Sequence, residues 1–101
     1  MRVFVFFDLP TDTASEKRVY RAFRRTLIQN GFIMLQESVY IRMLLNQTEV
    51  DSVVSAIRKN KPEKGSVMVL TVTEKQFSKM EIITGEYRTD KIDTDERLVI
   101  L

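Results

Sequence analysis

The chain contains no cysteine and no histidine. Without cysteine, disulfides, thiolate nucleophiles and thiolate zinc sites are excluded. Without histidine, there is no Ser-His-Asp triad, no histidine general base and no histidine metal ligand. Any catalysis therefore depends on carboxylate, hydroxyl, lysine or arginine side chains. A hard cation that prefers oxygen ligands, such as Mg²⁺, is the cofactor that such groups favour.

Glycine and proline are also scarce, with three and two residues among 101, so no linker or low-complexity segment is expected. No apolar stretch approaches the length of a membrane span. Only Arg2 precedes the first short apolar run, and no small-residue cleavage site follows it, so no signal peptide is expected. The composition predicts one cytoplasmic domain over residues 1–101.

Charge is nearly balanced overall but unevenly distributed along the chain. The 16 basic and 14 acidic residues give a net charge of +2. Residues 1–64 hold 11 basic and 7 acidic groups, a net charge of +4, whereas residues 65–101 hold 5 and 7, a net charge of −2. The N-terminal part is therefore the place to look for phosphate-binding groups.

Hydrophobic periodicity predicts a series of strands and helices. Residues 2–8 form an apolar run that indicates a central strand, which Pro10 ends. Thr13 and Glu16 have the spacing of a capping box, so a helix should begin there and end at Asn30. The remaining pattern predicts strands at 32–36 and 38–45, a helix from about 46, a strand at 66–73, and short strands at 80–84 and 98–101.

This β-α-β-β-α-β order predicts an α/β fold of the ferredoxin-like sandwich type, with a short C-terminal strand extension. Both helices should cover one face of an antiparallel sheet. The strands supply apolar side chains to the other face as well, including Phe4, Phe6, Met68 and Leu70. A second subunit is the simplest cover, so a homodimer is predicted. Residues from about 80 onward then form a tail for dimer or partner contacts.

Asp8 is the first candidate functional residue, because it ends an otherwise apolar strand. Alternation along the strand places it on the same face as Phe4 and Phe6. If that face is a dimer interface, two copies of Asp8 approach across the two-fold axis. Their carboxylates repel one another unless a cation such as Mg²⁺ or Mn²⁺ lies between them. The alternative is a solvated carboxylate at a strand end.

A basic helix is the second candidate. Opposite its apolar stripe, the first predicted helix carries five cations at helical spacing, Lys17, Arg18, Arg21, Arg24 and Arg25. Such a ridge suits the phosphates of a nucleic acid. A merely solvated basic face is the alternative, and it is also the simpler reading of the charged turn at 58–64. From the residues alone, a basic, dimeric domain with phosphate-binding potential follows, but catalysis does not.

Several stretches together resemble a known family. The strand end "VFFDLP", the basic first helix and the run "NGFIMLQESVYIRM" are similar to the small CRISPR-associated adaptation protein, the partner of the integrase in spacer acquisition. The resemblance covers essentially the whole chain. One departure is Phe7, because many members have tyrosine immediately before the aspartate.

The resemblance implies a homodimer in which each subunit gives its strand-end aspartate, here Asp8, to a shared metal site. It implies metal-dependent endonuclease activity on single-stranded RNA or double-stranded DNA, with Asp8 as the metal ligand and catalytic residue. It also implies that the dimer bridges integrase dimers while the basic helix holds the DNA duplex. A scaffold without catalysis and a small-molecule regulatory module remain alternatives. The terminal "RLVIL" is a candidate strand for a neighbouring sheet.

Overall fold

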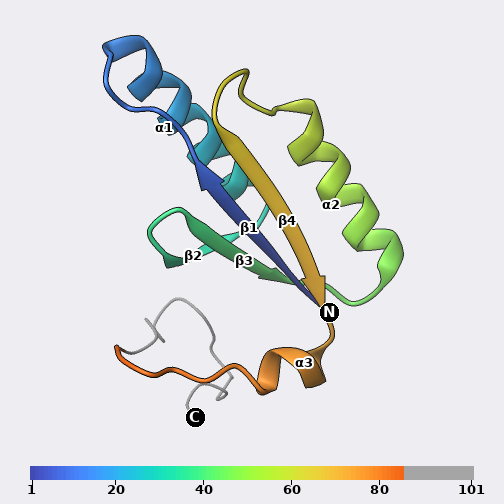
Figure 1. Cartoon of the computed structure of the whole chain (residues 1–101). Coiled ribbons are helices and arrows are strands. Elements are labelled where there is room, and N and C mark those ends of the chain that lie inside the picture. Colours follow the sequence, from blue (N-terminus) through green and yellow to red (C-terminus); the bar gives the residue numbers. More distant parts are fainter. Residues whose placement is uncertain (86–101) are drawn as a thin grey trace.

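The computed structural model describes residues 1–85 and contains one antiparallel sheet with two long helices on one face (Figure 1). The strands are β1 (Arg2–Asp8), β2 (Ile33–Gln36), β3 (Val39–Met43) and β4 (Ser66–Val72). Their order across the sheet is β2-β3-β1-β4. The helices are α1 (Ala14–Gln29), α2 (Gln47–Lys59) and α3 (Glu74–Ser78). The predicted ferredoxin-like βαββαβ order is confirmed.

The main core lies between the sheet and the two long helices. From the central strand β1, Val3, Val5 and Phe7 point into it, and α1 contributes Phe23 and Leu27. The α2 residues at helical spacing, Val50, Val53 and Ile57, complete the layer as the periodicity predicted. Because β1 is buried on both faces, its continuous apolar run is explained.

A local capping box fixes the start of α1, whereas a contact from another strand supports its end. The Thr13 hydroxyl accepts a hydrogen bond from the Glu16 amide at 3.0 Å, and the Glu16 carboxylate accepts one from the Thr13 amide at 3.1 Å. At the other end, the Arg42 guanidinium donates to the carbonyl oxygen of Asn30 at 2.5 Å. Since α1 has no basic residue in its last turn, strand β3 supplies the cation that its C-terminus favours.

The opposite sheet face is partly covered by a helix that the periodicity did not predict. Helix α3 begins with a second capping box, in which the Gln76 amide donates to the Thr73 hydroxyl at 3.1 Å. Phe77 packs against Phe4, with ring centroids 5.9 Å apart. The chain's own α3 therefore covers the area around Phe4, for which the sequence suggested a second subunit as the simplest cover.

A charged network holds α3 against the sheet. The Arg2 Nε atom donates to both carboxylate oxygens of Glu74, at 3.1 and 3.0 Å, and the Arg2 guanidinium lies 4.3 Å from the centre of the Phe77 ring. The N-terminal ammonium of Met1 is 3.4 Å from the same carboxylate. Partial burial opposes ionisation of Glu74, but Arg2 and the ammonium outweigh it and lower the pKa of that carboxyl.

The predicted strand at 80–84 is wrong. Residues 80–84 pair with no strand within the described part of the chain. The reason is α3, which turns the chain out of the line of β4 and lets Met80 pack onto the second sheet face instead. The other predicted short strand, at 98–101, lies outside the described residues.

Candidate functional site

Asp8 is the last residue of β1 and is exposed. The side chains of β1 alternate between the two faces of the sheet, as predicted. Val3, Val5 and Phe7 belong to the helix-side core. Phe4 and Phe6 belong to the cluster on the other face. Alternation places Asp8 with Phe4 and Phe6. Within residues 1–85, neither a hydrogen bond nor an ion pair engages its carboxylate, so the charge is available to a ligand.

Gly65, just before β4, and Ser66, its first residue, lie beside the strand end that carries Asp8. Ser66 is its antiparallel partner across the β1–β4 ladder. Gly65, with φ of +89°, lies so close that an added Cβ would be 2.5 Å from the carbonyl oxygen of Asp8. Neither residue was predicted as a site residue from the sequence. The only sequence feature that could have pointed to this contact is Gly65 itself, a glycine between a charged turn and an apolar run.

The donor set fits a hard divalent cation only in part. Carboxylate and hydroxyl oxygens are the ligands that Mg²⁺ and Mn²⁺ prefer. However, residues 1–85 contain no group of three or more aspartate, glutamate, histidine or cysteine side chains that could hold a metal ion. A cation at Asp8 would therefore need waters and groups from outside residues 1–85. A second copy could bring such a group.

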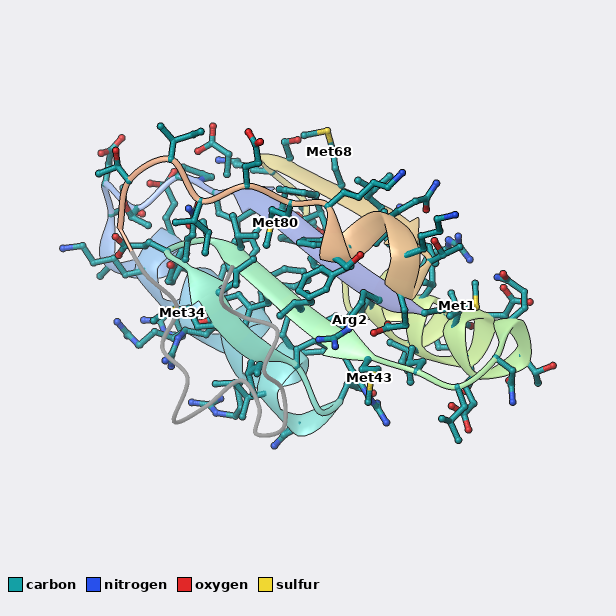
Figure 2. All side chains as sticks on the ribbon, turned by 90° about the horizontal axis from the view of Figure 1, so that it is seen from below. Met1, Arg2, Met34, Met43, Met68 and Met80 are labelled. Atoms are coloured by element: carbon teal, nitrogen blue, oxygen red, sulfur yellow. The ribbon has the colours of Figure 1, made fainter. Side chains whose placement is uncertain are left out.

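An apolar surface continues from Asp8 along the face that α3 leaves open. Met68 pairs with Phe6 and Leu70 pairs with Phe4 in the β1–β4 ladder. These two β4 side chains are 61% and 51% exposed. Figure 2 views the molecule from this side and shows Met68 projecting outward at the margin of the sheet. Exposed apolar side chains beside a buried cluster are typical of a surface that another protein covers.

The five cations of α1 occupy one side of the helix. Lys17, Arg18, Arg21, Arg24 and Arg25 are all exposed. At 3.6 residues per turn they fall within about 120° of the circumference, opposite Phe23 and Leu27. Both ion pairs within residues 1–85 involve Glu74, so no carboxylate of that part of the chain neutralises them.

Arg24 differs from the other four cations. Its Nε atom donates to the hydroxyl of Tyr40 at 2.6 Å, and Tyr40 is only 1% exposed. Arg24 thus has a structural role, because it provides the hydrogen-bond partner of a buried hydroxyl. The remaining four cations have no such partner within residues 1–85 and are the better candidates for phosphate contacts.

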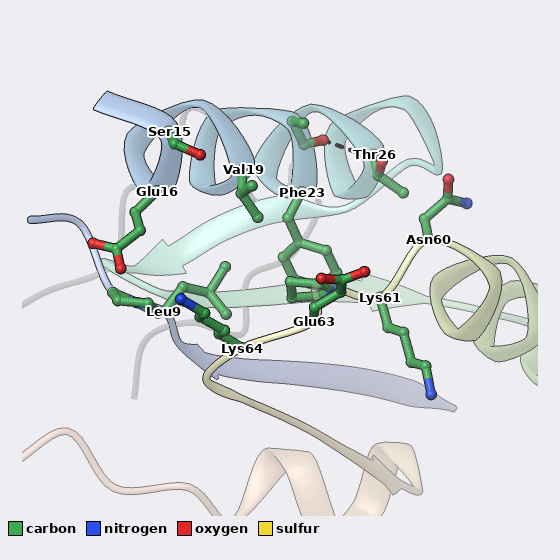
Figure 3. A pocket seen from close by; sticks show the side chains of 13 residues that line it. Leu9, Ser15, Glu16, Val19, Phe23, Thr26, Asn60, Lys61, Glu63 and Lys64 are labelled. Carbon is green, nitrogen blue, oxygen red and sulfur yellow. Dashed lines mark hydrogen bonds between the residues drawn. The ribbon is translucent and has the colours of Figure 1, made fainter. Parts of the chain in front are cut away.

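A groove of about 520 Å³ separates α1 from the turn between α2 and β4 (Figure 3). Val19 and Phe23 of α1 line one side, and Lys61 and Lys64 of the turn line the other. Figure 3 shows Lys64 beside Leu9, at the end of the groove where α1 begins. Lys64 also directly precedes Gly65, so the charged turn adjoins the Asp8 end of the sheet, a proximity that the sequence did not reveal.

Comparisons with known proteins bear directly on this arrangement. The family model described as CRISPR associated protein Cas2 matches residues 1–80. The chain belongs to the Cas2 family. A Treponema denticola protein named CRISPR-associated endoribonuclease Cas2 is 58% identical over 101 residues, covering 100% of both chains. A protein of the same name from Streptococcus mutans is 46% identical, covering 100% of this chain and 93% of its own.

A solved structure agrees with this membership at the level of the fold. The crystal structure of Streptococcus pyogenes Cas2 at pH 6.5 aligns with a TM-score of 0.62, covering 83% of this chain and 100% of that chain. Its sequence identity is 18%, so it supports the fold alone. The resemblance seen in the sequence is confirmed.

Phe7 immediately precedes Asp8 and is the one position where the sequence departs from the pattern expected from the resemblance. Its ring points into the helix-side core, where its centroid lies 5.2 Å from that of Phe23 and 5.7 Å from that of Tyr40. It is 5% exposed and lies on the opposite sheet face from the Asp8 side chain. Phe7 is thus a core residue, and its ring does not form part of the surface around Asp8.

No helix within residues 1–85 is long and apolar enough to cross a membrane.

Proposed function

We propose that this chain is a metal-dependent endonuclease of CRISPR adaptation, which hydrolyses phosphodiester bonds in single-stranded RNA or double-stranded DNA in the cytoplasm. The endoribonuclease name that the curated relatives carry supports the hydrolase class. The active form is a homodimer that bridges integrase dimers. Asp8 of each copy is the catalytic residue and binds Mg²⁺, with Mn²⁺ as a substitute.

The observation that carries this proposal is the unpaired Asp8 carboxylate at the edge of an exposed apolar face. A second copy that covers Met68 and Leu70 removes apolar area from water, which stabilises association by about 25 cal/mol per Å². The same contact brings the two Asp8 side chains toward one another at the two-fold axis. Two close carboxylates favour a divalent cation between them.

Different residues of the chain would bind the cation and the substrate phosphates at such a site. Asp8 of each copy holds the cation, which when bound supplies Lewis acidity to a phosphoryl oxygen and lowers the pKa of water. Lys17, Arg18, Arg21 and Arg25 neutralise phosphates and orient the backbone of the substrate. Lys64, next to Gly65, adds a positive charge at the Asp8 end of the sheet.

A second candidate function is a scaffold that grips duplex DNA between integrases without cutting it. The specific observation in its favour is the burial of the sheet aromatics. Phe4 is 8% and Tyr40 1% exposed, so neither offers a ring on which an unpaired base could stack. The cations of α1 are exposed, which favours contact with a phosphate backbone over readout of single-stranded bases.

Cleavage and binding assays with Asp8→Asn test both functions. Asp12→Asn is the matched control, because Asp12 is exposed and only its amide makes a hydrogen bond, to Glu16. Single-stranded RNA and double-stranded DNA are incubated with Mg²⁺, Mn²⁺ or chelator. The proposal predicts cleavage that needs metal, persists in Asp12→Asn and disappears in Asp8→Asn.

Binding of duplex DNA is measured on the same proteins and on Arg21→Gln and Arg25→Gln as salt rises. Each lost phosphate contact should reduce the slope of log affinity against log salt by about 0.9. Equal cleavage by wild type and Asp8→Asn would refute the site. If no protein cuts but all bind the duplex, the scaffold is the correct function.

A further inference from the structure

The residues where the charged turn enters strand β4 lie against the Asp8 end of β1. Gly65 and Ser66 follow Lys64 at the end of the charged turn. An added Cβ on Gly65 would lie 2.5 Å from the Asp8 carbonyl oxygen and 3.0 Å from the Cα atom of Leu9. The backbone of β1 and that of the turn are therefore in contact, and only glycine fits between them.

The register of the β1–β4 ladder determines which face carries the Ser66 side chain. The β1–β4 ladder pairs Asp8 with Ser66, Phe7 with Val67 and Phe6 with Met68. Directly paired residues of antiparallel strands point to the same face, with Cβ atoms about 4.5–5.5 Å apart. The Ser66 hydroxyl and the Asp8 carboxylate therefore share the face that carries the apolar surface, at the end of the ladder.

The Ser66 hydroxyl has no structural task within residues 1–85. Thr13 and Thr73, which also lie at element ends, use their hydroxyls to accept hydrogen bonds from helix amides. Ser66 is exposed and makes no side-chain hydrogen bond within that part of the chain, and neither does Asp8. Two adjacent oxygen-bearing side chains are thus open to the same ligand.

We propose that Ser66 is a positioning residue of the cation site at Asp8, where its hydroxyl hydrogen-bonds the water shell of the bound divalent ion. Mg²⁺ and Mn²⁺ bound by one or two carboxylates keep several waters, which need hydrogen-bonding partners. In a dimer, each Asp8 brings its own Ser66. The inference rests on the proposed function, because it assumes that Asp8 binds the ion.

The test measures Mn²⁺ binding by electron paramagnetic resonance of the free ion, without nucleic acid and without an activity readout. Ser66→Ala removes the hydroxyl, and Ser66→Thr keeps it on a side chain that suits a strand. Ser52→Ala is the matched control, since Ser52 is exposed on α2, outside the site. Loss of such an outer-shell partner should raise the dissociation constant about 10-fold. Ser66→Thr and Ser52→Ala should bind as wild type does.

The Asp8→Asn variant separates failure of this inference from failure of the proposed function. If Asp8→Asn loses Mn²⁺ but Ser66→Ala binds it like wild type, the role of Ser66 is refuted while the metal site stands. If Asp8→Asn binds Mn²⁺ as tightly as wild type, or if wild type binds none, both are refuted. Far-ultraviolet circular dichroism of each variant checks that weaker binding does not come from unfolding.

Discussion

Substitution of Gly65 by alanine tests how the Asp8 strand end is held. Alanine at φ of +89° is strained, at a cost of roughly 1–2 kcal/mol. Its Cβ would also lie 2.5 Å from the Asp8 carbonyl oxygen, which is backbone and cannot rotate away. Forcing such an atom into packed surroundings costs about 1–3 kcal/mol more.

One effect acts in the opposite direction. Alanine restricts the unfolded chain more than glycine does, which stabilises the folded state by about 0.4–1 kcal/mol. The net expected loss for Gly65→Ala is therefore about 3 kcal/mol at the middle of these ranges. Small domains are stable by only about 5–15 kcal/mol in total. The variant should remain folded near neutral pH but unfold at clearly lower urea concentration.

Gly85→Ala is the matched control for this prediction. Gly85 also has a positive φ, of +98°, but an added Cβ would meet no atom of residues 1–85 within 4 Å. It should suffer the backbone strain without the clash, a net loss of about 1 kcal/mol. Urea unfolding followed by circular dichroism gives both free energies. Equal losses in the two variants would refute the reasoning that Gly65 is required by its contact with Asp8.

Two further predictions concern side chains outside the site. Arg24→Ala should lower the free energy of unfolding by about 1–3 kcal/mol, because it leaves the buried hydroxyl of Tyr40 without its partner. Arg25→Ala, an exposed neighbour, should change it by about 0.5 kcal/mol or less, and equal effects in urea unfolding would contradict the structural task of Arg24. Glu74→Gln should be less stable than wild type at pH 7, because Arg2 and the N-terminal ammonium lower the pKa of Glu74 and so favour its charged form in the folded state. The stability difference between wild type and Glu74→Gln should vanish as the pH falls below the ordinary glutamate pKa of 4.5 and through the lowered pKa of the folded state. Urea unfolding of both proteins across this pH range measures the difference. A difference that stays constant would contradict the pairing of Glu74 with Arg2 and the ammonium.

Local sequence signals predicted the long elements because their causes are local. The capping box of Thr13 and Glu16 fixes the start of α1 through residues three apart. The spacing of Val50, Val53 and Ile57 identifies α2 and its buried side. Helix α3 was missed because five residues are too short to show a helical period.

Contacts between distant segments were beyond the reach of such signals. The five cations of α1 share one helical spacing, but only Arg24 among them donates a hydrogen bond to Tyr40 within residues 1–85. The spacing could not reveal this difference. Arg42, on β3, interacts with the C-terminal end of α1. Both interactions depend on how the helices and strands pack together. Many side-chain pairings between them are compatible with the same hydrophobic pattern in the sequence.

The sequence by itself determined the order of the elements from β1 to β4, the helix-side core, the basic face of α1 and the place of Asp8 at a strand end. The tertiary structure alone decided what surrounds Asp8. Gly65 and Ser66 reach it through the register of the β1–β4 ladder, and α3 covers only part of the adjoining apolar face. Register and docking depend on the packing of the whole sheet, because they join residues that are far apart along the chain.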